Sequence, residues 1–269
     1  MLGYYALSAL EVASALRPGL RALASLSGRM LVDEVAVRDG GVRFAVRSPM
    51  DIWTVKETWV DRVYERFGHP LRDGWTVVDV GAGFGDFSLR AAAAGPAVRV
   101  HAFEPHPGSR ALLEANLSRN AEERVTVHEQ AVAAATGTVA LHASEQALDS
   151  RVGDPGTGAV PALSLANALD AAGAARCDLL KLDCEGSEFP ILEGAGAETL
   201  ARVDRIVMEY HDDDAAGRDH RELARLLAGH GFAVGAWRSP VHAHLGYLRA
   251  TRVRTGAATR EGGGGGRGA

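Results

Sequence analysis

Cysteine is scarce in this sequence, and long runs of one charge are missing. Only Cys177 and Cys184 occur among 269 residues, too few for a disulfide framework and without the second pair or histidine cluster of a zinc site. The formal net charge of -5 comes without a sustained lysine or arginine run, which argues against a nucleic-acid or polybasic membrane surface. We therefore expect a reducing cytoplasmic location and a small-molecule substrate, with no nucleic-acid or membrane partner.

An uninterrupted apolar run of membrane length is also missing. The opening stretch is rich in alanine and leucine, but Glu11 and Arg17 interrupt it, and it lacks the basic start of a signal peptide. Residues 1–50 are predicted to form a helical arm, divided at Pro18, and a β-hairpin turning at Gly40. We expect the arm to pack on the core or to form a homodimer; a cap over the substrate site is the alternative.

The sequence is rich in short β-branched runs that alternate with alanine-rich stretches. Over residues 51–252 this pattern is typical of βαβ units and predicts an α/β fold with a seven-stranded, mostly parallel sheet and helices on both faces. The expected strands are 76–80, 98–104, 124–129, 178–183, 205–210, 232–237 and 244–250. The last two are joined by RSPVHA, too short for a crossover helix, so they should pair antiparallel at an edge. The glycine-rich residues 253–269 are predicted to be disordered.

The first expected strand leads into three glycines at alternate positions, in VVDVGAGFGDF (residues 77–87). Gly81, Gly83 and Gly85 would let the chain turn directly into a helix and let a ligand approach the backbone. A dinucleotide fingerprint would need glycine where this chain has Asp86. An NAD-dependent oxidoreductase is therefore the disfavoured alternative, since nearby acids would also repel a pyrophosphate.

Acidic side chains follow several of the expected strands, whose carboxyl ends meet at one edge of a parallel sheet. They would attract a ligand that carries a sulfonium and an α-ammonium group, and Glu104 is placed to bind a ribose diol. S-adenosylmethionine accounts for the glycines and the acids together. The residues of these strand ends predicted to bind it are Asp79, Gly81, Ala82, Gly83, Gly85, Phe87, Glu104, Pro105, Glu129, Gln130 and Asp183.

Four more stretches extend the glycine segment into a family pattern: WTVKETWVDRVYERF, HAFEPHPGSRALLEANLSRN, DLLKLDCEGSEFPILEGA and IVMEYH. Over roughly residues 43–250 the chain resembles the FkbM-type S-adenosylmethionine-dependent methyltransferases. The most distinctive part is KLDCEGSE, which begins at Lys181. The resemblance implies a class I methyltransferase (Rossmann-like) fold with strand order 3-2-1-4-5-7-6, and O-methylation of hydroxyl groups on sugars or natural-product scaffolds. N-methylation of a small molecule remains an alternative.

The resemblance also assigns roles by position. It implies that the glycines and Glu104 bind the cofactor and that Asp183 stands between cofactor and acceptor. It further implies that Glu57 and Tyr64 line the mouth of the cofactor site. The alternative for this last segment is an amphipathic helix whose Trp59, Val60, Val63 and Tyr64 face the core.

An alcohol must lose its proton to a base or a metal before it can accept a methyl group. Asp183, with Glu185 beside it, is the first candidate base, and His211 is the second because histidine titrates near neutral pH. Alternatively, Asp183, Glu209 and His211 could hold Mg²⁺ or Mn²⁺, which would acidify the hydroxyl. Glu209 could instead be a buried acid satisfied by backbone donors.

Overall fold

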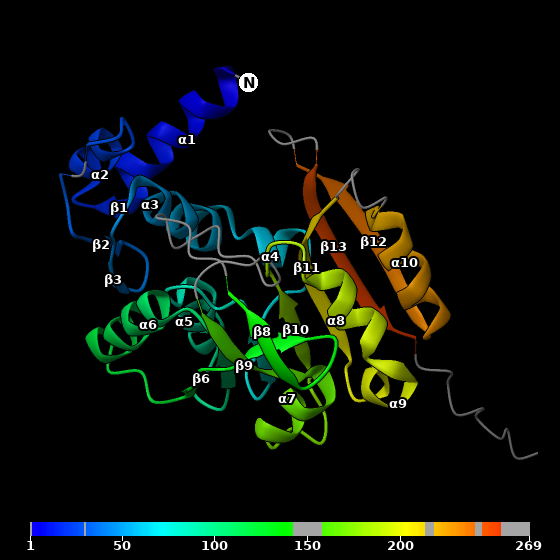
Figure 1. Cartoon of the computed structure of the whole chain (residues 1–269). Helices are drawn as coiled ribbons and strands as arrows, with labels where there is room; N and C mark the ends of the chain where they lie inside the picture. Colours follow the sequence, from blue (N-terminus) through cyan, green and yellow to red (C-terminus); the bar gives the residue numbers. More distant parts are fainter. Residues whose placement is uncertain (1, 30, 142–157, 213–217, 240–243, 254–269) are drawn as a thin grey trace, which may run out of the picture.

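A seven-stranded sheet forms the centre of the molecule (Figure 1). The computed structural model describes residues 2–29, 31–141, 158–212, 218–239 and 244–253. The sheet order is β12-β13-β11-β10-β4-β5-β6. Its strands are β4 (Thr76–Val80), β5 (Arg99–Phe103), β6 (Val125–His128), β10 (Leu179–Leu182), β11 (Arg205–His211), β12 (Phe232–Arg238) and β13 (Leu245–Arg252). All seven expected strands and the expected order are confirmed. β13 pairs antiparallel with both β11 and β12.

Each face of the sheet has its own hydrophobic core, because successive strand residues point to opposite faces. Val77 and Leu179 belong to one core and Val78 and Leu180 to the other. The first core is covered by α1 (Leu2–Ala15), α3 (Pro49–Val55), α5 (Asp86–Ala92) and α6 (Pro107–Arg119). The second is covered by α7 (Leu165–Ala171), α8 (Glu188–Gly194), α9 (Gly196–Ala201) and α10 (His220–Gly229). The predicted helices on both faces are confirmed.

The N-terminal arm packs on the first of these cores. Pro18 separates α1 from α2 (Gly19–Ser25), and β2 (Glu34–Val37) and β3 (Arg43–Ala45) form the hairpin, as predicted. The short strand β1 (Leu16–Arg17) pairs with β2, so the small sheet has three strands where two were expected. Val35 and Phe44 share a core with Val77, so packing is continuous across the predicted boundary at residue 50. A homodimer through the arm stays a prediction.

The segment before β4 is not the regular helix that its pattern predicted. α3 begins in a capping box formed by Ser48 and Asp51, and it continues into a π-helical turn, η1 (Lys56–Asp61). Arg62 then takes a left-handed conformation before α4 (Val63–Arg66). Trp59, Val63 and Tyr64 are buried as expected, whereas Val60 is only half-buried. The wide turn rotates the residues that follow relative to a regular α-helix.

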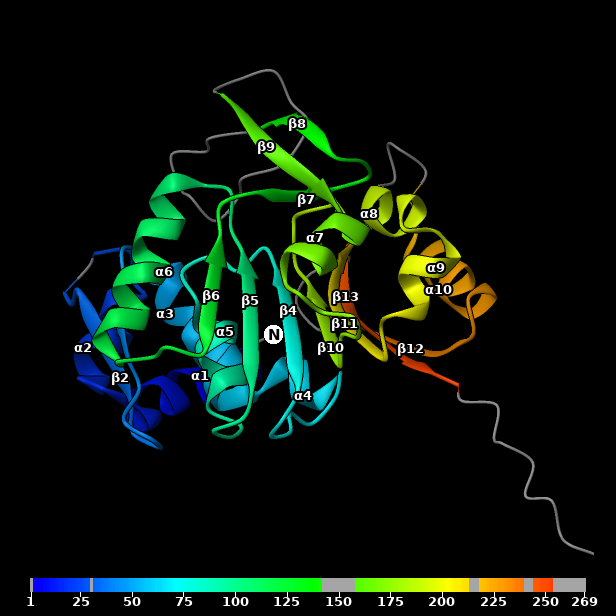
Figure 2. The same ribbon diagram turned by 90° about the horizontal axis from the view of Figure 1, so that it is seen from below.

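A second small sheet was not anticipated. It consists of β7 (Ala131–Ala133), β8 (Gly137–Ala140) and β9 (Ala159–Ser164), and it lies beyond the carboxyl ends of β5 and β6 (Figure 2). Its short, alanine-rich segments carry little of the β-branched signal used to find strands. The predicted disordered tail, apart from Val253, falls outside the described residues. None of the helices in the described ranges is long and apolar enough to cross a membrane.

Candidate active site

A cavity of about 520 Å³ lies at the carboxyl ends of β4, β5, β10 and β11. This is where the chain order reverses between β4 and β10, the usual place for a ligand in such a sheet. The size suits a small molecule with most of its surface enclosed. Trp53 and Glu57 from the segment before β4, Val132 of β7 and Tyr247 of β13 complete the walls. No described residue of α1 or α2 lines it, so the described part of the arm is not a cap over the site.

The glycine loop fits tightly between its neighbours. Gly81 has a φ of +73°, and a Cβ there would lie 1.9 Å from the carbonyl oxygen of Asp183. Gly85 has a φ of +90°, and its Cβ would lie 2.3 Å from Leu113. Gly83, with a φ of +56°, faces open space within the cavity lining. The loop therefore leaves its open side at Gly83, where a ligand can approach the backbone.

Glu104 is held directly beside this open side. Its carboxylate accepts the N–H groups of Gly83 and His106, both at 2.8 Å. Burial raises the pKa of Glu104 to about 7 despite these two hydrogen bonds. Each carboxylate oxygen has a second lone pair, so the group can also accept from the two hydroxyls of a ribose. This geometry fits the cofactor that the sequence predicted.

A buried ion pair supports the loop from below. Lys181 Nζ lies 3.0 Å from Asp79 Oδ1, donates to the carbonyl of Gly81 at 2.8 Å and lies 3.7 Å from Asp183 Oδ2. Burial opposes the charge of Lys181, but the surrounding acids raise its pKa above the usual value. Asp79 also accepts from Ser88 Oγ at 2.6 Å. Asp79 therefore lies beneath the cavity, paired with Lys181, and does not line it.

The segment before β4 reaches the cavity through several polar side chains. Thr58 Oγ1 donates to Asp86 Oδ2 at 2.5 Å, and Tyr64 donates to Asp183 Oδ2 at 2.6 Å. Glu57 lines the cavity. Burial raises the pKa of both Glu57 and Asp86 to about 7. Glu57, distant in sequence from the glycine loop, and Asp86, directly after it, thus add to the acidic lining.

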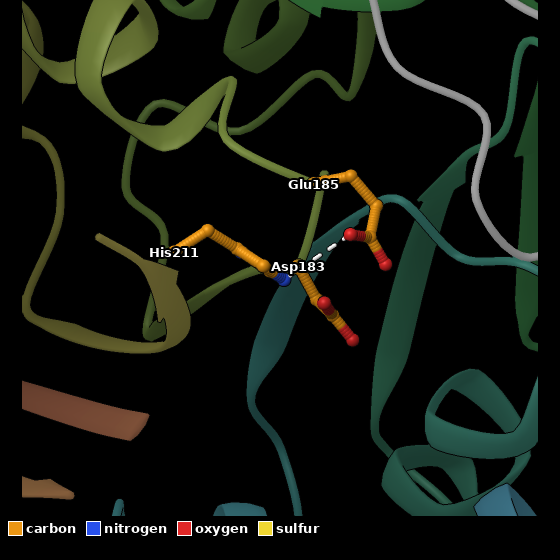
Figure 3. A group of neighbouring side chains, drawn as sticks. All are labelled: Asp183, Glu185 and His211. Carbon is orange, nitrogen blue, oxygen red and sulfur yellow. Dashed lines mark ion pairs between the residues drawn. The ribbon is translucent and has the colours of Figure 1, made fainter. Parts of the chain in front are cut away.

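His211, at the end of β11, points toward Glu185, with Asp183 close by (Figure 3). Its Nε2 is 3.3 Å from Glu185 Oε2, and its Nδ1 is 3.4 Å from Glu188 Oε1. Burial disfavours the charged ring, but the contacts with Glu185 and Glu188 outweigh it and raise the pKa of His211 to about 11. These contacts favour the charged ring and so oppose the predicted role of His211 as a base, which stays a prediction. Glu188, fully buried, is a member of this cluster that the sequence did not single out.

The predicted metal ligands are only partly brought together. One ligand atom each from Asp183, Glu185 and His211 lies within 4.8 Å of the others, whereas Glu209 falls outside this group. Both ring nitrogens of His211 already face carboxylates. Glu209 has no hydrogen bond or ion pair among the described residues, so no described backbone donor satisfies it, and its alternative role as a backbone-satisfied acid stays a prediction. Burial, and then Asp183, raise its pKa well above the usual value.

The structure brings most of the predicted site residues to one cavity. Those that line it are Glu57, Tyr64, Gly81, Gly83, Glu104, Pro105, Asp183, Glu185, Glu209 and His211. Asp79, Ala82, Gly85 and Phe87 are buried and do not line the cavity. Glu129 is exposed and lies 3.5 Å from Arg110, and neither it nor Gln130 lines the cavity. The chain turns into β7 directly after them, which carries them away from the strand ends.

Some lining residues gave no signal in the sequence. Ser239, His244 and Tyr247 come from β13 and the segment before it. Tyr247 is paired with Glu209 in the register of β11 and β13, so both side chains point to the same face. In the sequence Tyr247 is indistinguishable from an ordinary core residue of a strand.

Comparison with known proteins identifies the family. The model of the methyltransferase FkbM domain matches residues 79–234. A Streptomyces tacrolimicus protein, 31-O-demethyl-FK506 methyltransferase FkbM, is 34% identical over 221 residues, covering 70% of this chain and 84% of that protein. Methyltransferase 1 of Beauveria bassiana is 25% identical over 207 residues, covering 68% and 81% of the two chains.

A solved structure shares the fold. It is a candidate rRNA methylase from Clostridium thermocellum, with a TM-score of 0.50, 13% sequence identity, and coverage of 73% of this chain and 97% of that chain. The family match also removes the oxidoreductase alternative. The chain belongs to the FkbM methyltransferase family and is an S-adenosylmethionine-dependent methyltransferase with a class I fold.

Proposed function

We propose that this enzyme methylates a hydroxyl oxygen of a sugar or natural-product intermediate, with Asp183 as the base. The name of the Streptomyces relative, a 31-O-demethyl-FK506 methyltransferase, supports an oxygen acceptor in secondary metabolism. The acid-lined cavity supports a small molecule as the partner. The observation that carries the proposal is the placement of Asp183 between the glycine loop and the far half of the cavity.

The two carboxylate oxygens of Asp183 differ in their contacts with the described residues. Tyr64 and Lys181 both lie against Oδ2, at 2.6 and 3.7 Å. No described residue forms a hydrogen bond or ion pair with Oδ1, and the side chain is 27% exposed. One oxygen is thus held in place while the other is free to take a proton. This is the arrangement that a positioned general base requires.

The far half of the cavity is suited to the acceptor. The glycine loop and Glu104 occupy the half above β4 and β5, which leaves the half above β10, β11 and β13. Leu245 and Tyr247 supply apolar and aromatic surface there, and Ser239 and Glu209 supply polar groups. A hydroxylated molecule with an apolar body matches such a lining.

The reaction can be written with its atoms balanced. Bound S-adenosylmethionine supplies a methyl group on a positively charged sulfur and leaves as neutral S-adenosylhomocysteine. The acceptor oxygen forms a bond to the methyl carbon as the sulfur–carbon bond breaks, and the hydroxyl proton passes to Oδ1 of Asp183. Tyr64 and Lys181 hold Oδ2 meanwhile, so the contribution of the protein is mainly positioning and proton removal.

We propose that this proton transfer is direct and needs no divalent metal. The contacts of both His211 nitrogens with Glu185 and Glu188 support this choice, because a metal bound to His211 would have to replace the proton that the ring shares with one of these carboxylates. The expected result is an unchanged rate after chelation, with or without added Mg²⁺ or Mn²⁺. Loss of activity on chelation and recovery with Mg²⁺ would instead assign the Asp183, Glu185 and His211 cluster to a metal.

The acceptor atom can be tested directly. The enzyme is incubated with S-adenosylmethionine labelled in its methyl group and with a panel of hydroxylated macrolides, sugars and amino sugars. The product is then examined by NMR. The expected product carries the label as a methoxy group. Label on nitrogen would replace the proposal with N-methylation, and cofactor binding without any labelled product across the panel would contradict a hydroxyl acceptor of these classes.

A further inference from the structure

The N-terminal arm touches the cofactor site through one buried lysine. Lys56, the first residue of η1, is 1% exposed. Its Nζ lies 2.6 Å from Asp61 Oδ2, 3.0 Å from Glu11 Oε2 and 3.0 Å from Ser8 Oγ. Asp61 belongs to η1 itself, whereas Ser8 and Glu11 belong to α1. A buried ammonium is stable only while such partners surround it, so its position depends on the arm.

The π-helical turn that Lys56 holds is an uncommon element. Lys56 and Asp61, the first and last residues of the turn, form an ion pair with each other. Arg62, directly after the turn, has a φ of 52°. Isolated π-helical turns are rare and often occur near functional sites. Backbone conformations of this kind persist only where side-chain contacts fix them. Ser8 and Glu11 therefore supply part of what fixes this turn.

The other side of the same turn faces the cofactor half of the cavity. Thr58 donates to the carboxylate of Asp86 at 2.5 Å, and Trp59 Nε1 donates to the carbonyl of the same residue at 3.0 Å. Asp86 is the first residue of α5, directly after the glycine loop. Glu57, between Lys56 and Thr58 in the sequence, lines the cavity. The turn thus joins the arm to the loop that receives the cofactor.

We infer that Ser8 and Glu11 of the N-terminal arm are positioning residues for the cofactor site, and that they act through Lys56 and Thr58 on Asp86. The arm reaches the site only indirectly, since its described residues do not line the cavity. Its contact with Lys56 fixes the register of the turn, and the turn places Thr58 and Glu57. Loss of the arm's contacts should weaken cofactor binding even though no cofactor-contacting residue is changed.

The test measures S-adenosylhomocysteine affinity by calorimetry on the full chain, which needs neither an acceptor nor Asp183. The variant S8A/E11Q removes the arm's partners while Asp61 still pairs with Lys56, so no buried charge is left alone. We expect its Kd to rise about tenfold, within the range by which contacting residues couple. Glu11→Gln alone, at a half-exposed position, should show a smaller rise in the same direction.

The matched control is Glu34→Gln in the hairpin. Glu34 pairs with Arg43 and Arg119 and forms no hydrogen bond or ion pair with a described residue of η1, so the affinity should stay at the wild-type value. A Kd within twofold of wild type for both Glu11→Gln and S8A/E11Q would overturn the inference. So would an equal loss in the Glu34→Gln control.

A double-mutant cycle separates positioning from general destabilisation. In the Thr58→Val background the side-chain link to Asp86 is cut and the Trp59 hydrogen bond to its carbonyl remains, so S8A/E11Q should cause a smaller further loss of affinity than it causes in the wild-type chain. A purely structural effect of the arm would instead add fully to that of Thr58→Val. Full additivity would therefore contradict the proposed route, and failure of the proposed O-methylation would leave this result unaffected.

Discussion

The two halves of the cavity are built differently. In the cofactor half the carboxylates have donors: Glu104 accepts two backbone N–H groups, and Asp86 accepts the hydroxyl of Thr58. In the acceptor half Glu209 has no such partner among the described residues, and Asp183 uses only one of its two oxygens. The carboxylates of the cofactor half are therefore held in place by donors of the protein itself. The acceptor half keeps unused hydrogen-bonding capacity for the substrate and its proton.

The two halves differ because cofactor binding and proton removal need different things from their side chains. Binding a cofactor benefits from side chains that are already locked by neighbouring groups. Proton removal needs a lone pair that is free at the moment of reaction. Separate substitutions in the two halves should therefore change different parameters.

Asp183→Asn should have the largest effect. We expect kcat to fall about a thousandfold, within the usual range for loss of a general base, because an amide of the same size cannot take the proton. The Kd of S-adenosylhomocysteine should change less than about threefold, since Tyr64 can still donate to the amide oxygen. The comparable variant at the opposite end of β10, Asp178→Asn, should keep its kcat. Near-normal turnover in Asp183→Asn would remove this residue from the mechanism.

Two glycine substitutions should separate the structural part of the loop from its binding part. Gly81→Ala places a methyl group against the carbonyl of Asp183, so the free energy of unfolding should fall by about 3 kcal/mol. Gly83→Ala meets open space, so it should cost only about 1 kcal/mol for its backbone conformation while weakening cofactor binding. Urea unfolding and calorimetry on both variants measure the two effects. Equal destabilisation by both would contradict this division of the loop.

Glu104→Gln should weaken cofactor binding roughly ten- to hundredfold, the value of hydrogen bonds to a charged group. The amide can accept only through its oxygen, so it cannot satisfy both the Gly83 and His106 N–H groups as well as a ribose diol. At saturating cofactor, turnover should be largely retained. Glu129→Gln is the matched control, and the exposed position of Glu129 predicts unchanged affinity. A loss of turnover without a loss of affinity in Glu104→Gln would reverse the assignment of the two halves.

The sheet could be predicted from the sequence because its signals are local. Each strand is a short β-branched run, and each core face follows from alternation, as Val77 and Val78 show. The glycine loop and Glu104 were found for the same reason, since parallel strands bring their carboxyl ends together whatever lies between them. The second sheet gave little such signal, because β7 is only three residues long with two alanines, and β9 contains a proline.

The sequence was least informative about the site where the arrangement depends on contacts between distant segments. His211 was read as a near-neutral base because nothing in its neighbourhood in the sequence shows Glu185 and Glu188 on either side of its ring. Glu129 was placed at the site because it ends a strand, but the direction of the following turn decides where it points. The π-helical turn at Lys56 likewise depends on Glu11, 45 residues earlier in the numbering.

The most direct test of the electrostatic claim is the pH dependence of S-adenosylmethionine and S-adenosylhomocysteine binding. Burial raises the pKa of Glu57, Asp86 and Glu104 to about 7 in the ligand-free site. These acids are largely protonated at pH 6 and ionised at pH 8, and only the ionised forms attract the sulfonium. Calorimetric titrations at the two pH values should show both ligands gaining affinity through Glu104, which is placed to bind the ribose that both carry. S-adenosylmethionine should gain about tenfold more for each of Glu57 and Asp86 whose proton it displaces, because S-adenosylhomocysteine lacks the charge on sulfur. Equal pH dependence for the two ligands would contradict the claim that the acidic lining recognises the charge on sulfur.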